Sequence, residues 1–111
     1  MVSIIMNCHN GGIFLRQSIT SILNQSYENW ELIFYDNCSS DNSKQIIEKF
    51  KDNRIKYFKS KFFLNLYHAR NNAIKKAKGK YIAFLDTDDW WKKNKLQEQI
   101  KFLKKNKNVK I

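Results

Sequence analysis

Residues 81–89 of this chain read YIAFLDTDD, and this stretch is the strongest indicator of the fold. Its first five residues are apolar, aromatic or branched, which is typical of a strand buried on both faces of a sheet. Asp86, Asp88 and Asp89 follow at once, and carboxylates this close repel one another unless a cation lies among them. Two interpretations stay open. One is a site for Mg²⁺ or Mn²⁺ carrying a phosphate-bearing ligand, and the other is an acidic loop that caps the next helix through Asp88 or Asp89.

The remaining sequence alternates strand patterns with helix patterns. Apolar runs at residues 2–6, 30–35 and 55–58 predict three more strands, the third nearer a sheet edge because lysines surround it. Apolar side chains at helical spacing predict a helix after each strand. The four helical faces consist of Leu15, Ile19, Ile22 and Leu23, of Ile46, Ile47 and Phe50, of Ala69, Ala73 and Ala77, and of Leu96, Ile100 and Leu103.

This alternation predicts an α/β fold with a mostly parallel sheet, helices on both faces and right-handed crossovers. Asp41 is expected to cap the second helix, and Gly79 is expected to end the third. Residues 109–111 look like the opening of a fifth strand. We therefore expect a single domain over residues 1–111 that is the N-terminal part of a longer protein.

Charge and composition narrow the function classes. The net charge is +11, and the last twenty residues alone contain eight Lys and one Glu. Such a basic helix suits an anionic partner, either nucleic acid or an acidic membrane face, or it is simply a solvated lysine surface. Arginines are few and the aromatic residues lie in apolar strands, which argues against nucleic acid.

The location expected from the sequence is cytoplasmic, with a peripheral contact to the inner face of the membrane left open. No apolar run approaches the roughly 20 residues of a membrane span, and no basic leader precedes the first strand. Cys8 and Cys38 are too few for a disulfide framework, so both are expected to be reduced.

The glycines and histidines exclude several common sites. With only Gly11, Gly12 and Gly79, the chain has neither a dinucleotide-binding fingerprint nor a phosphate-binding loop that ends in Gly-Lys-Ser/Thr. There is no Gly-x-Ser-x-Gly nucleophile turn, and His9 and His68 lack the spacing of a zinc site. A bound phosphate must therefore be held by a metal and side chains.

Polar residues follow three of the predicted strands directly. Residues 7–10 read NCHN, residues 36–39 read DNCS and residues 86–89 read DTDD. In open parallel sheets, ligands bind beyond the carboxyl ends of the strands. If the strands are parallel, the three clusters converge on one rim, and this convergence predicts a ligand site there.

The ordered set of motifs resembles family 2 glycosyltransferases. The resemblance rests on residues 2–10 (VSIIMNCHN), 18–27 (SITSILNQSY), 31–33 (ELI), 36–41 (DNCSSD), 69–71 (ARN) and 79–89 (GKYIAFLDTDD). It covers essentially the whole chain. It implies a GT-A fold and an inverting transferase that uses a nucleotide-diphosphate sugar, most readily a UDP-sugar, and a divalent metal, Mg²⁺ or Mn²⁺. The acceptor implied is a glycan or a lipid-linked saccharide.

The resemblance also implies roles for single residues. Asp88 would face the metal and Asp86 the ribose, while the base would lie among the side chains at the ends of the first two strands. Arg70 would approach the base or the diphosphate. The implied nucleotide-binding residues are Asn7, His9, Asp36, Asn37, Arg70 and Asp86, and the implied metal ligand is Asp88.

Three departures from the family pattern qualify these roles. Asn7 replaces the usual proline and His9 the usual tyrosine of the first loop, which weakens base stacking. Asn37 replaces the second acid of an Asp-Asp pair, so that base identity is less defined. The family's catalytic base lies beyond Ile111, so the chain alone is expected to bind nucleotide but to be weak or inactive in transfer.

Plainer roles stay open beside these. Asp36 could cap the following turn, Arg70 could pair with Asp36 or Asp88, and His9 could be an uncommitted loop residue. Trp90 and Trp91 could shield a sugar, but one or both are expected in the core. For the whole chain, the alternatives are a non-catalytic nucleotide-binding or assembly module and, less favoured, a basic nucleic-acid-binding domain.

Overall fold

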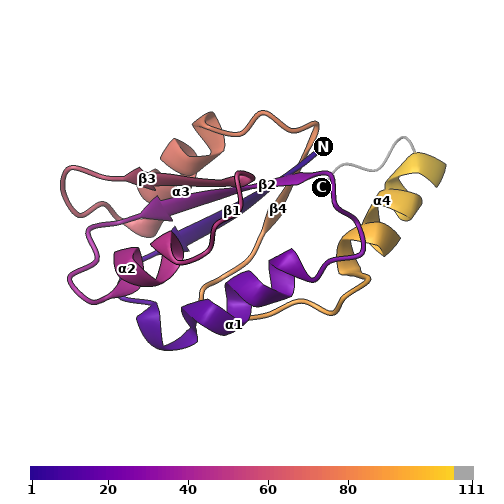
Figure 1. Ribbon diagram of the computed structural model, residues 1–111. Helices are drawn as coiled ribbons and strands as arrows, with labels where there is room; N and C mark the ends of the chain where they lie inside the picture. The colour runs from indigo at the N-terminus through magenta and orange to yellow at the C-terminus, as the bar shows by residue number, and fades with distance from the viewer. Residues whose placement is uncertain (107–111) are drawn as a thin grey trace.

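The computed structural model describes residues 1–106 as a four-stranded sheet with helices on both faces (Figure 1). All strand pairs are parallel, and the strand order is β3-β2-β1-β4. The predicted α/β class is thereby confirmed. The elements are β1 (Val2–Cys8), α1 (Gly12–Leu23), β2 (Trp30–Asp36), α2 (Ser43–Glu48), β3 (Ile55–Lys59), α3 (Leu66–Lys75), β4 (Tyr81–Phe84) and α4 (Lys95–Lys105).

The two central strands are buried almost throughout because helices cover both of their faces. Side chains alternate along β1, so Ile4 and Met6 face one layer and Ile5 faces the other. The first layer holds α1, α2 and α4, and it forms the larger core together with Trp91. The second layer is α3 alone, whose Ala69 and Ala73 lie fully buried against the sheet. Alanine allows this close packing of helix on strand.

The two edge strands differ from the centre. β3 is an edge strand, as the surrounding lysines predicted, and its residues are only half-buried or exposed. β4 forms the opposite edge and ends at Phe84, which lies across from Ile5 of β1. Because every strand runs the same way, all four carboxyl ends point to one rim of the sheet, on the left in Figure 1.

One expectation about the fold was wrong in detail. Gly79 does not end α3, whose C-cap is Lys76. Its role is close approach instead: its backbone N–H donates to Ser3 Oγ over 2.7 Å, and a Cβ there would meet the backbone oxygen of Met1 at 2.7 Å. The predicted fifth strand at 109–111 lies outside the described residues.

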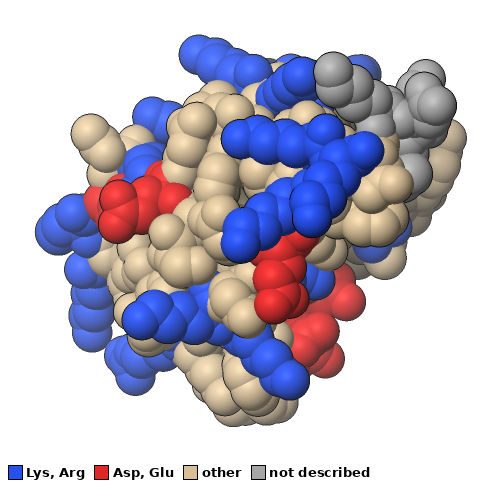
Figure 2. Space-filling model, turned by 90° about the vertical axis from the view of Figure 1, so that its right-hand side faces the viewer, with Lys and Arg blue, Asp and Glu red and all other residues tan. Residues whose placement is uncertain are grey.

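The last helix has the predicted amphipathic pattern. Leu96, Ile100 and Leu103 are buried, whereas Lys101, Lys104 and Lys105 are exposed and Lys95 is half-buried. Figure 2 shows this side of the molecule, where Lys and Arg side chains cover much of the surface. Among residues 1–106, no helix has the length and apolar character that crossing a bilayer requires.

Candidate functional site

The loops after the four strands meet at the carboxyl rim of the sheet. The first and second loops are joined by Asn10, whose Oδ1 accepts hydrogen bonds from Ser40 N over 2.7 Å and from Asp41 N over 3.2 Å. Asn10 adopts a φ of 55°, a left-handed conformation that asparagine tolerates better than most residues. The predicted convergence of the first two polar clusters is confirmed.

Asp41 holds the same two loops together from the other side. Its Oδ2 accepts from Gly12 N over 3.0 Å, and its Oδ1 accepts from Ser43 N over 3.0 Å. It therefore accepts from the first N–H group of both α1 and α2, although the N-cap position of α2 is Asn42. Burial acts to raise the pKa of Asp41, but the bonds from Ser43 and Gly12 prevail and hold it below its ordinary value.

The acidic loop, defined here as residues 86–89, reaches the same place through Gly11. A Cβ on Gly11 would lie 2.7 Å from Thr87 Oγ1 and 2.9 Å from Thr87 Cβ. Glycine is therefore required for the first and fourth loops to touch. All three polar clusters predicted to converge do lie at one rim, on neighbouring strands β2, β1 and β4.

The third loop, residues 60–65, is also part of this rim, which the sequence did not suggest. The side-chain amide of Asn37 donates to Leu64 O over 2.7 Å, and its Oδ1 accepts from Leu64 N over 2.9 Å. His9 contacts the same loop edge-on, with its ring centroid 4.7 Å from that of Phe63. His9 Nδ1 also lies 2.8 Å from Asn37 O.

Asp36 is fully engaged within the protein. It is 2% exposed, and its carboxylate accepts from Ser39 N over 2.9 Å and from the phenol of Tyr57 over 2.6 Å. Burial, followed by the bond to Asp36, raises the pKa of Tyr57. The phenol therefore stays protonated and donates. Asp36 thus makes the turn contact considered for it, and its contact with Tyr57 was not predicted.

Asn7 and Arg70, unlike Asp36, each have a buried polar atom that lacks a hydrogen bond among residues 1–106. The two atoms are Asn7 Oδ1 and Arg70 Nε. Asn7 lies on the face of β1 that carries Ile5, which is the face that α3 covers. The Arg70 guanidinium lies 5.2 Å from the Phe84 ring centroid, two residues before the acidic loop. Buried polar atoms are normally paired, so these two atoms depart from the usual pattern and are available to a hydrogen-bonding group from outside the protein.

The acidic loop can hold a hard cation. Asp86, Asp88 and Asp89 are exposed, and the loop is a tight turn in which Asp89 N donates to Asp86 O over 3.1 Å. Within residues 1–106, no three His, Cys, Asp or Glu side chains form a complete cation site. Mg²⁺ typically takes one or two carboxylates and completes its shell with substrate phosphates and water. The exposed carboxylate oxygens fit that kind of site.

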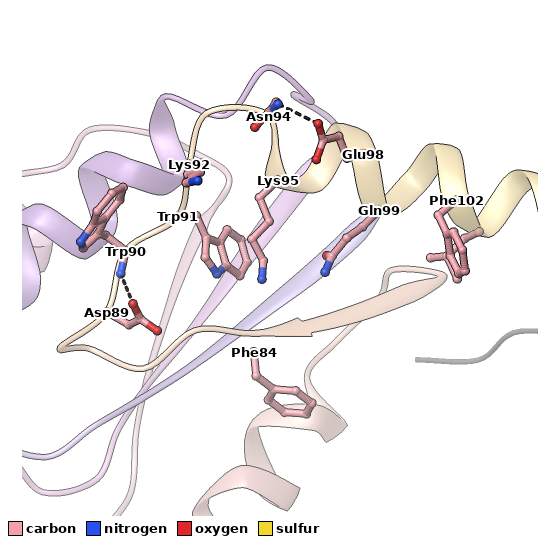
Figure 3. Close-up of a pocket in the computed structure, with 11 residues that line it drawn as sticks. Phe84, Asp89, Trp90, Trp91, Lys92, Asn94, Lys95, Glu98, Gln99 and Phe102 are labelled. Carbon is pink, nitrogen blue, oxygen red and sulfur yellow. Dashed lines mark hydrogen bonds between the residues drawn. The ribbon is translucent and has the colours of Figure 1, made fainter.

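A large open cavity of about 670 Å³ lies beside this rim, between β4 and α4 (Figure 3). In Figure 3, Trp91 and Lys95 lie on one side of β4, with Lys95 Nζ 5.0 Å from the Trp91 ring centroid, and Phe84 lies on the other. Asp89 and Trp90 connect the cavity to the acidic loop. Trp91 is buried as expected, whereas Trp90 is 53% exposed.

Both cysteines are free thiols. Cys8 Sγ lies 3.7 Å from Ser39 Oγ, and Cys38 Sγ lies 3.5 Å from Ser60 Oγ. They support the rim loops through polar contacts and form no disulfide.

Known proteins are similar to this chain in sequence and in fold. The chain is 45% identical over 106 residues to UDP-Glc:alpha-D-GlcNAc-diphosphoundecaprenol beta-1,3-glucosyltransferase WfgD of Escherichia coli. The aligned region covers 96% of this chain and 42% of that protein. It is 37% identical over 105 residues to the putative teichuronic acid biosynthesis glycosyltransferase TuaG of Bacillus subtilis, covering 93% and 42% respectively. The chain thus spans about two fifths of the length of these relatives.

The fold matches S. aureus TarS 1–349 in complex with UDP. The TM-score is 0.87 at 27% identity, over 94% of this chain and 32% of that one. The GT-A type of sheet expected from the resemblance is thereby confirmed. The family model described as "Glycosyl transferase family 2" matches residues 3–110. Its match over nearly the whole chain, together with these relatives, shows that the chain belongs to glycosyl transferase family 2.

Proposed function

We propose that this chain forms the donor site of an inverting glycosyltransferase that builds cell-envelope polysaccharide. The observation that carries the proposal is the pair of unpaired buried atoms, Asn7 Oδ1 and Arg70 Nε. Both residues were implicated in nucleotide binding by their place in the motif order. Both lie near the strand ends where ligands bind in parallel sheets.

The donor we propose is a nucleoside-diphosphate sugar, with a UDP-sugar favoured. S. aureus TarS was crystallised with UDP and with UDP-GlcNAc, and the relative from E. coli is named for UDP-Glc. The exposed His9 ring, set edge-on against Phe63, offers an aromatic surface for a base. Arg70 has a planar fork of donors suited to phosphate or carbonyl oxygens.

Asp36 and Asn37 enter this proposal mainly as positioning residues. Their side chains are buried and hydrogen-bonded to Tyr57, Ser39 and Leu64. They hold the second and third loops at the rim, where the ribose and base would lie. A direct contact of either side chain with the base would require exchange of these bonds.

We propose that Asp88, assisted by Asp86, holds a divalent cation, Mg²⁺ or Mn²⁺, at the acidic loop. Such a cation neutralises the charge that grows on a leaving nucleoside diphosphate. The protein's own contribution is to keep these carboxylates exposed, with no ion pair to either among residues 1–106. The close contact between Gly11 and Thr87 fixes the loop at the rim.

The proposal extends to the acceptor and the catalytic base of the reaction. Two relatives are named for diphosphoundecaprenol-linked acceptors, so a lipid-linked saccharide is the acceptor we propose. The base that deprotonates its hydroxyl would come from sequence beyond Ile111. Residues 1–111 alone would therefore bind nucleotide but transfer sugar weakly or not at all, and the reaction would take place at the cytoplasmic side of the membrane.

Calorimetric titration with UDP tests the donor site. We expect binding in the presence of Mn²⁺ and about 100-fold weaker binding without it or in Asp88→Asn, because the phosphates lose their bridging cation. The control is Glu98→Gln, a change at an exposed acid on α4 whose Oε1 accepts a hydrogen bond from Asn94, and this variant should leave the affinity unchanged. Absence of binding to any nucleoside diphosphate with Mn²⁺ would contradict the proposal.

A further inference from the structure

Four large apolar side chains are exposed within six residues at the rim beside β3. These residues, named here the apolar fringe, are Phe62 (69% exposed), Phe63 (62%), Leu66 (59%) and Tyr67 (73%). They lie in the loop after β3 and in the first turn of α3. Single exposed apolar residues are common, but a contiguous group of this kind marks an interaction surface.

The apolar fringe is held in place by the fold. The Asn37 amide pairs with both backbone groups of Leu64, and Leu64 packs inward against the core layer under α3. Asn65 caps α3 by accepting from His68 N over 2.9 Å. Because the backbone is fixed on both sides, the fringe side chains are presented outward and do not reach the core.

The charged residues nearest to the apolar fringe along the chain are cations. Residues 53–85 contain no Asp or Glu. Lys59 and Lys61, both exposed, flank the fringe directly. The acidic loop lies at the opposite edge of the sheet, beyond β2 and β1. The fringe therefore combines exposed aromatic groups with neighbouring cations.

We propose that the apolar fringe inserts into the headgroup region of an anionic lipid bilayer and turns the rim of the sheet toward it. Aromatic side chains favour the membrane interface, and lysines near the surface gain attraction from anionic lipids. A lipid surface explains both features, whereas a protein partner would not require the cations. The purpose of this orientation rests on the proposed function, since a lipid-linked acceptor would then meet the donor site at the membrane.

The basic helix α4 cannot provide this insertion. Its apolar residues Leu96, Ile100 and Leu103 are buried against the core, which leaves lysines and Phe102 on the surface. It can attract an anionic surface but offers little to insert. The side chains that insert into the bilayer are therefore those of the apolar fringe. Insertion of these side chains distinguishes the proposal from simple attraction between lysines and anionic lipids.

Co-sedimentation of the full-length protein with vesicles containing phosphatidylglycerol tests the proposal. We expect the double variant Phe62→Ser/Tyr67→Ser to lose roughly tenfold or more in partitioning to the vesicles, because two aromatic side chains that would be buried in the lipid headgroup region are removed. Phe102→Ser, which alters an equally large exposed side chain on α4, is the matched control and should bind as wild type. Lys59→Gln/Lys61→Gln should weaken binding to anionic vesicles and leave binding to neutral ones unchanged.

Fluorescence quenching by brominated lipids reports depth directly. After the quenching of the native tryptophans in the wild-type protein is subtracted, the fluorescence of the tryptophan introduced by Phe62→Trp should be quenched more strongly than that introduced by Phe102→Trp. Equal quenching of the two variants would overturn the proposal. So would wild-type partitioning of Phe62→Ser/Tyr67→Ser, or binding that depends only on Lys101, Lys104 and Lys105.

These outcomes are separable from those of the donor site. Asp88→Asn should bind vesicles as wild type, and Phe62→Ser/Tyr67→Ser should bind UDP as wild type. Failure of vesicle binding with intact UDP binding overturns the membrane proposal alone. The reverse result overturns the donor-site proposal alone.

Discussion

The rim of the sheet contains one buried carboxylate, Asp36, and one exposed set of carboxylates, the acidic loop. Asp36, at the end of β2, is buried and accepts hydrogen bonds from Ser39 and Tyr57. The acidic loop after β4 is exposed, and the bond from Trp90 N to Asp89 Oδ1 is local to the loop. Both groups follow apolar strands that lie on either side of β1.

The contrast separates a structural role from a ligand-binding role. A buried carboxylate is tolerated only when its oxygens are paired, and those of Asp36 are paired by the protein itself. Exposed carboxylates that repel one another stay available for a cation from outside. The four changes below test this division, and each is measured as the free energy of unfolding in urea.

Asp36→Ala should cause the largest loss of stability. The change leaves the Tyr57 hydroxyl and Ser39 N–H without partners in a buried site, which should cost about 3 kcal/mol. The comparison is Asp88→Ala, which should change the free energy of unfolding by less than about 0.5 kcal/mol. Equal losses in the two variants would contradict the division.

Gly11→Ala should have the next largest effect. Its Cβ would lie within 3 Å of Thr87 Oγ1 and Cβ, so one of the two loops must move, at a cost of about 2 kcal/mol. The variant should also weaken UDP binding with Mn²⁺, because the acidic loop is displaced. Adding Thr87→Gly should recover part of both losses, and a double-mutant cycle measures the coupling. No coupling would show that the loops do not depend on this contact.

Tyr57→Phe should cost about 1 kcal/mol at neutral pH, because one donor to Asp36 is lost while that from Ser39 stays. Burial, followed by the hydrogen bond to Asp36, raises the pKa of Tyr57 above its ordinary value of 10.0. Its contribution is therefore complete below about pH 10 and is lost as the pH rises further. Wild-type stability should fall more steeply than that of Tyr57→Phe in this range. Parallel curves would contradict the assignment.

Asp86→Asn/Asp88→Asn should have the smallest effect on stability. Removing like charges from an exposed loop should shift the free energy of unfolding by less than about 0.5 kcal/mol, in the stabilising direction. UDP binding with Mn²⁺ should nevertheless be lost in the same protein. A large destabilisation would mean that the acidic loop has a structural role after all.

The sequence predicted the architecture because its signals are local. Apolar runs alternate with helical spacing along the chain, and this alternation permits few arrangements other than a parallel sheet. The meeting of residues 7–10, 36–39 and 86–89 then follows from strand direction. The edge position of β3 was predicted because its lysines suit an exposed strand.

What the sequence did not predict depends on pairs distant along the chain. The bond between Tyr57 and Asp36 depends on the pairing of β2 with β3, which no local pattern reveals. The hydrogen bonds between Asn37 and Leu64 and the contact of His9 with Phe63 likewise join residues that are far apart in the sequence. Gly79 was read as a helix end because glycine favours that position, but here it allows backbone contact with β1.

The central position of β1 has a consequence for synthesis of the chain. Val2 lies opposite Trp30 on one side and Tyr81 on the other, so the first strand made receives its second neighbour last. Until residue 84 leaves the ribosome, β1 has a free hydrogen-bonding edge of the kind that promotes association between nascent chains. Any shortened version that stops before residue 81 would therefore leave β1, which is buried almost throughout in the fold, as an open edge.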